Sequence, residues 1–113
     1  MRTIKWAVML IFLSCNENSK PPKDILGREK MAEILADIHM AESRVSKMNL
    51  RSMDSSVVVF SKLQQDIWAK YEVDSSLYNK SYSYYASNPE AMNSLYEIVT
   101  QKLEKTDTTS VKQ

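Results

Sequence analysis

The chain has 113 residues, with 15 Lys and Arg against 14 Asp and Glu, and it contains one Cys, one His and one Gly. Acids and bases alternate along it, which excludes the basic patch that a nucleic-acid partner requires. One cysteine cannot close an intramolecular disulfide, and a single Cys with a single His cannot form a zinc cluster. A single Gly excludes a glycine-rich phosphate loop. The composition therefore predicts no metal, no cofactor and no small-molecule substrate.

The N-terminus has the layout of a secretory signal. Arg2 and Lys5 supply basic charge, residues 6–13 are apolar and uncharged, and the small residue Ser14 follows. This apolar run is too short to span a bilayer, which takes about 20 residues. We expect residues 1–14 to be a signal peptide, and a buried strand is the alternative.

The four residues "FLSC", ending at Cys15, resemble the lipobox of bacterial lipoproteins. Leu13, Ser14 and Cys15 fit that pattern, whereas Phe12 stands where Leu or Val is usual. The resemblance implies that the Cys15 sulfur is acylated and that Cys15 becomes the mature N-terminus, because several acyl chains together anchor a protein stably in a membrane. An ordinary buried thiol is the alternative.

Composition divides the rest of the chain into three parts. Residues 15–24 form the lipidated cysteine and a polar tether, in which Pro21-Pro22 favours extended backbone. Residues 25–105 are long enough for one domain and only one. Residues 106–113 are polar and predict a disordered tail.

Apolar residues recur at three- and four-residue steps within the predicted domain, which is typical of helices. The "VVVF" run beginning at Val57 would suit a strand, but the helical period continues for three turns beyond it. None of the segments is apolar all round, so each needs partners. We predict an all-α fold, a small bundle of three to four antiparallel helices, with segments at about residues 28–48, 55–71, 75–86 and from Pro89 onward. Candidate N-caps are Ser52 or Asp54, Asp74 and Asn88.

Charged side chains offer little chemistry. On a helix His39 and Glu42 share a side, while Asp37 points away from His39 by about 200°. We interpret His39 as a core-boundary histidine bonded to Glu42 or to a neighbouring helix, and a metal ligand or general base is the alternative. Glu29 and Glu33 are interpreted as a solvated surface pair. With no G-x-S-x-G turn and one possible base, we predict no catalytic residue and no enzyme activity.

Tyrosines dominate residues 77–89, which hold four of them within about two helical turns. Such a number must cover more than one helix face, so some pack and some present a hydroxyl to solvent. One interpretation is that they fill a thin core; the other is a surface that binds a protein or a sugar. The candidate surface consists of Trp68, Tyr78, Tyr82, Tyr84 and Tyr85.

Three sequence blocks, each present once, carry a family resemblance along residues 21–103. They are Lys30-Met31 with "DIHMAE", then "IWAKY", and then Tyr84-Tyr85, Pro89 and "LYEIV". In these blocks the chain is similar to a family of small lipoproteins of unknown function from Bacteroidota. That family usually has a glycine soon after the position of Lys70-Tyr71, where this chain continues Glu72-Val73-Asp74. The resemblance implies a lipid-anchored helical domain and supplies no site residues.

Our leading hypothesis is a non-enzymatic, membrane-tethered helical module that binds another cell-envelope protein. The alternative is a lipoprotein that binds glycan or peptidoglycan through exposed Tyr and Trp. Asn16 follows the cysteine where an inner-membrane retention signal would have Asp, so we expect the outer membrane, facing the periplasm.

Overall fold

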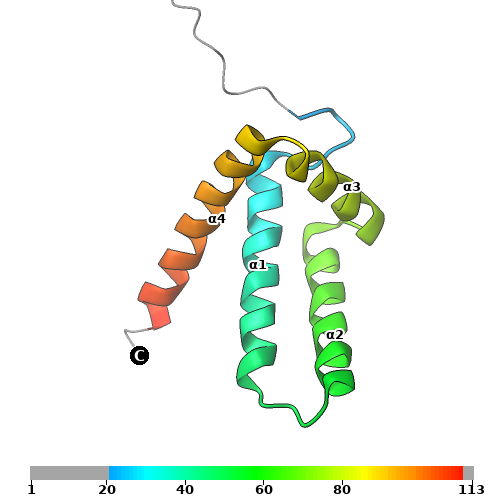
Figure 1. Cartoon of the computed structure of the whole chain (residues 1–113), viewed down its shortest axis with the longest axis vertical. Helices are drawn as coiled ribbons and strands as arrows, with labels where there is room; N and C mark the ends of the chain where they lie inside the picture. Colours follow the sequence, from blue (N-terminus) through cyan, green and yellow to red (C-terminus); the bar gives the residue numbers. More distant parts are fainter. Residues whose placement is uncertain (1–20, 111–113) are drawn as a thin grey trace, which may run out of the picture.

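The computed structural model describes residues 21–110, with side chains described as far as Thr106, so the predicted signal peptide and Cys15 lie outside the described residues. Four helices and no strand make up this part of the chain (Figure 1). The prediction of an all-α bundle of antiparallel helices is confirmed. The helices are α1 (Arg28–Lys47), α2 (Met53–Tyr71), α3 (Ser75–Ala86) and α4 (Pro89–Ser110).

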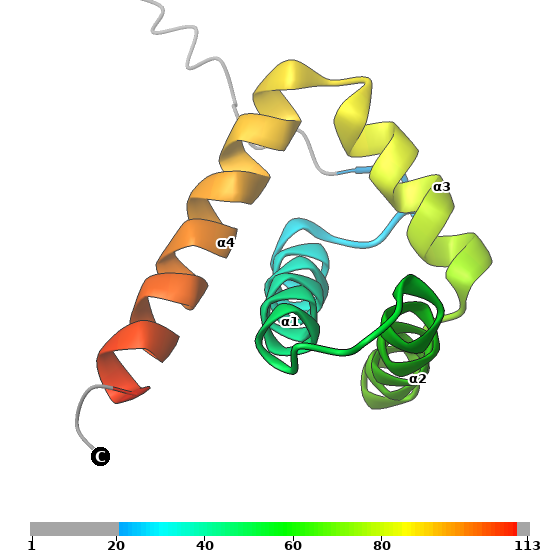
Figure 2. The ribbon, with the colours of Figure 1, turned by 60° about the horizontal axis from the view of Figure 1, so that its bottom comes forward.

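Helix α1 is the centre of the fold. It forms an antiparallel hairpin with α2, while α4 lies obliquely along its other side and α3 joins α2 to α4 (Figure 2). Because helices flank α1 on two sides, its apolar positions extend beyond one stripe and include alanines that let the neighbouring backbones approach. Its buried residues are Met31, Ala32, Ile34, Leu35, Ala36, Ile38 and Ala41.

Local sequence sets most helix ends. The Ser52 hydroxyl accepts a hydrogen bond from the Ser55 backbone N–H at 3.1 Å, and the Asp74 carboxylate accepts one from Leu77 at 2.7 Å. Both side chains are N-caps, because each accepts a hydrogen bond from a backbone N–H of the first helical turn. Ser52 rather than Asp54 is therefore the N-cap of α2. The Asn88 side-chain amide donates instead to the Tyr84 carbonyl at 2.7 Å, across the corner between α3 and α4.

Glu72 ends α2 in the left-handed conformation, with φ 54° and ψ 44°. Glu72 begins the run after Lys70-Tyr71 in which the sequence analysis noted the lack of the usual glycine. In this conformation a residue with a Cβ is less stable than glycine by about 1 kcal/mol. The turn is still closed by the Val73 N–H, which donates to the Trp68 carbonyl at 3.0 Å.

Helix α4 extends further than we predicted. The predicted domain boundary falls at residue 105, whereas α4 continues to Ser110. Once a helix is established, each further residue adds a backbone hydrogen bond without a new nucleation cost, so a polar composition need not end it. The Thr106 hydroxyl also bonds back to the Lys102 carbonyl at 3.0 Å.

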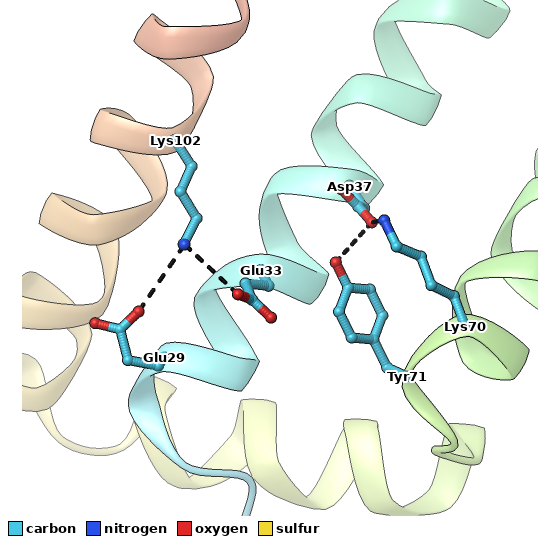
Figure 3. A network of polar contacts seen from close by, with 6 residues as sticks. All are labelled: Glu29, Glu33, Asp37, Lys70, Tyr71 and Lys102. Carbon is cyan, nitrogen blue, oxygen red and sulfur yellow. Dashed lines mark hydrogen bonds and ion pairs between the residues drawn. The ribbon is translucent and has the colours of Figure 1, made fainter.

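Polar contacts fix α2 and α4 to α1 (Figure 3). Asp37 of α1 accepts hydrogen bonds from Lys70 and from the Tyr71 hydroxyl of α2, each at 2.8 Å. On the other side, Lys102 of α4 lies 3.9 Å from Glu29 and 3.8 Å from Glu33. Both glutamates are exposed, as expected for a solvated surface pair, and they also face a lysine that is distant in sequence.

The segment before α1 is bound to α3 through the backbone of Leu26. Its N–H donates to the Ser81 hydroxyl at 2.9 Å, and its carbonyl accepts from the Tyr85 hydroxyl at 2.7 Å. Ser81 is 0% and Tyr85 1% exposed. Asp24 forms an ion pair with Lys80, which lowers the pKa of the Asp24 carboxyl. The ion pair brings Asp24, the last residue of the predicted tether, next to α3.

Ser81→Ala should lower the free energy of unfolding by about 1–3 kcal/mol, since it leaves the buried Leu26 N–H without an acceptor. Urea unfolding followed by circular dichroism measures this change. Ser83→Ala is the matched control, because Ser83 is exposed on the same helix and should change stability by less than about 0.5 kcal/mol. Equal stability of the two variants would contradict the role assigned to the Leu26 contacts.

Candidate functional site

Side chains from all four helices meet in an aromatic face, which we define as His39 and Glu42 of α1, Trp68 of α2, Tyr78 and Tyr82 of α3, and Tyr96 of α4. The Trp68 and Tyr78 rings lie 4.8 Å apart, and the Tyr78 and Tyr82 rings 6.1 Å apart. The rings of His39 and Tyr96 are 6.3 Å apart. Tyr82 is exposed, at 39%, while the other three aromatic residues are half-buried. The face is thus a packed layer with one aromatic side chain projecting from it.

Two of the predicted surface tyrosines leave this face. Tyr85 is buried beside Leu26, so its assignment to an interaction surface is wrong. Its burial follows from the tertiary contact with the N-terminal segment, which the helical spacing could not reveal. Tyr84 packs edge-on against Tyr85 with ring centroids 5.2 Å apart and is half-buried.

Two phenols of the aromatic face, Tyr78 and Tyr96, have a raised pKa, which favours their neutral form. Burial, and then the negative fields of Tyr82, Tyr96 and Glu42, raises the pKa of Tyr78 to about 12. Burial, and then the fields of Tyr82 and Glu42, raises the pKa of Tyr96. At neutral pH these hydroxyls are therefore hydrogen-bond donors, and they are unsuited to act as bases.

Glu42 and His39 occupy the α1 side of the face. The His39 Nδ1 atom lies 3.4 Å from a Glu42 carboxylate oxygen, as expected for a core-boundary histidine paired along its own helix. Asp37 points toward α2 and takes no part in the face. Among the side chains described, residues 21–106, no three of His, Cys, Asp or Glu lie together as metal ligands would.

A groove between α1 and α2 continues from Glu42 toward the loop that joins the two helices. It has a volume of about 600 Å³, and its apolar lining comes from Val45, Leu50, Val57 and Phe60. The sequence analysis did not identify this groove. The available signal was the "VVVF" run, which has more apolar residues than one helix stripe uses, so that Val57 and Val58 stay exposed.

The chemical groups of the aromatic face suit binding. The aromatic face combines flat apolar area with hydroxyl donors and one carboxylate, which suits a partner that has both apolar and polar groups. Among the described residues the face contains no pair of nucleophile and base and no convergent set of charges. None of the described helices is long and apolar enough to span a bilayer.

The chain belongs to the family described as a domain of unknown function (DUF4296), whose pattern matches residues 22–109. That match agrees with the structure in starting at Pro22, within the segment bound to α3, and in including most of α4. The resemblance drawn from the sequence blocks is confirmed at the level of a domain of unknown function. No curated protein and no solved structure matches the chain.

Tyr78→Phe should remove the phenol that titrates at the highest pH in an ultraviolet absorbance titration. Because its folded pKa of about 12 exceeds the ordinary value of about 10, the neutral phenol stabilises the fold below pH 10, and that contribution is lost as pH rises toward 12. The variant should lose this part of the alkaline destabilisation. The opposite result would be that Tyr78→Phe removes one phenol from the absorbance transition near pH 10. That result would show that Tyr78 is exposed to solvent.

Proposed function

We propose that this protein is a lipid-anchored, non-enzymatic module of the bacterial cell envelope that binds another envelope protein through the aromatic face. The observation that carries the binding role is Tyr82, which projects at 39% exposure from a layer of rings built by all four helices. Aromatic side chains anchored in this way lose little conformational entropy on binding, and they are enriched at protein interfaces.

The anchor rests on the position of Cys15, at the end of a short apolar segment and within the lipobox resemblance. Only residues 16–20 separate it from the start of the described part of the chain. Five residues reach at most about 17 Å, so an acylated Cys15 would hold the helical domain close to the membrane. Asn16 favours the outer membrane, with the domain facing the periplasm.

A glycan or peptidoglycan ligand is the second candidate. It is favoured by the neighbouring Tyr78 and Tyr82 rings, whose planes differ by 33°, together with the carboxylate of Glu42 on the same face. A sugar would stack on the exposed ring and donate hydroxyls to the carboxylate. Fluorescence titration with cell-wall fragments, read at Trp68 and the tyrosines, separates this ligand from a protein partner.

Intact mass spectrometry of the protein extracted in detergent tests the anchor. We expect a mass that lacks residues 1–14 and includes acyl chains on Cys15, whereas Cys15→Ala should keep the signal and carry no lipid. The control is the same extract treated to cleave ester-linked acyl chains, which should shift only the wild-type mass. Retention of residues 1–14 without acylation in the wild type would refute the lipoprotein proposal.

Photo-crosslinking in cells tests the partner. A photoreactive amino acid replaces Asn79, which is exposed on α3 near Tyr82. Tyr82→Ala should then reduce the crosslinked product at least tenfold, because an anchoring aromatic residue contributes about 2 kcal/mol or more to an interface. Ser83→Ala is the exposed control on the same helix. Equal crosslinking by the Tyr82 and Ser83 variants, both with wild-type helical content, would remove the aromatic face from the proposal.

A further inference from the structure

The hairpin tip, which we define as residues 44–58, exposes most of the large apolar side chains that reach solvent in the described part of the chain. It comprises the end of α1, the loop and the first turns of α2 (Figure 1). Met53 is 80% exposed, Val58 69%, Val57 58% and Met48 45%, and Tyr82 is the one further large hydrophobic residue exposed in residues 21–106. A group of exposed apolar side chains of this kind marks a site that binds a protein or a membrane.

The hairpin tip is also basic. Residues 43–53 contain Arg44, Lys47 and Arg51 and no acid, although acids and bases alternate elsewhere in the chain. None of these three cations has an ion-pair partner among the described residues. Asp54 follows in the first turn of α2, where its charge favours the positive end of that helix. The tip therefore combines exposed apolar side chains with unpaired positive charge.

We propose that the hairpin tip binds an anionic lipid surface, with Met48, Met53, Val57 and Val58 entering the headgroup region and Lys47 and Arg51 contacting lipid phosphates. Apolar side chains bordered by Lys and Arg are the chemistry of interfacial membrane binding. A second copy of the chain would bring like charges together at this surface. The tip is the free end of the hairpin, so no other described helix stands between it and a planar bilayer (Figure 1).

The geometry permits this contact together with the proposed anchor, although the contact does not depend on it. Residues 21–27 and the hairpin tip lie at opposite ends of α1 (Figure 1). A helix of 20 residues is about 30 Å long, so the tip lies roughly that far from the N-terminal segment. With both ends on one membrane, the hairpin lies along the bilayer. The aromatic face shares no residue with the hairpin tip, so each contact can be tested with its own variants.

A fluorophore at the tip tests the proposal in the full-length chain. In a Cys15→Ser background, Met53→Cys is labelled with an environment-sensitive dye, and Gln101→Cys, exposed on α4, is labelled as the control position. Vesicles of phosphatidylcholine alone are compared with vesicles that contain phosphatidylglycerol. We expect the dye at position 53 to shift to the blue on anionic vesicles only, and the dye at position 101 to stay unchanged on both.

Charge reversal supplies the matched variants. Each Lys or Arg near an anionic surface contributes about fivefold to binding, so Lys47→Glu with Arg51→Glu should weaken the contact by about 25-fold or more and abolish the shift. Lys23→Glu with Lys30→Glu makes the same charge change at the other end of α1 and should leave it intact. A dye at position 53 that remains in water on anionic vesicles would overturn the proposal. So would a shift caused by the soluble envelope fraction and not by vesicles, which would indicate an acidic protein partner.

Discussion

The backbone of Leu26 links the part of the chain before α1 to the helix that follows α2. Its N–H and its carbonyl are both paired with side chains of α3, and both side chains are buried. A buried backbone group without a partner costs about 1–3 kcal/mol, so this pairing constrains where α3 can lie relative to the start of α1. Since α3 also leads directly into α4, the same contact restricts the corner from which α4 begins.

Helix α1 accounts for the remainder of the architecture. Its apolar surface extends around most of the helix, because α2 and α4 cover it from two sides. The polar contacts at the edges of these two interfaces, Asp37 with Lys70 and Tyr71 and Lys102 with Glu29 and Glu33, select one arrangement among the several that apolar packing alone would tolerate. Exposed ion pairs contribute little to stability individually, so we assign them to specificity of packing.

Two surfaces remain after the core is complete, and they differ in chemistry. The aromatic face is a mixed layer of rings, hydroxyls and one carboxylate, which can recognise a specific partner. The hairpin tip is apolar and basic, and it needs no shape complementarity to meet a lipid surface. The chemistry of these two surfaces is compatible with the proposed role of a tethered binding module.

Sequence periodicity and capping residues were sufficient to predict the four helices, because their signals lie within a few residues of one another. Ser52, Asp74 and Pro89 mark helix starts in this way, and the third helix matches its predicted bounds, Ser75–Ala86. Cys15 and its apolar neighbours likewise support a prediction about the anchor without any fold. The tertiary structure alone decided which tyrosines are buried. It also decided that Asp24 and Leu26 contact α3, that Glu29 and Glu33 face Lys102, and that the tip of the hairpin stays uncovered. These features depend on contacts between residues far apart in sequence. A local sequence pattern does not contain the information about which distant residue a side chain will contact.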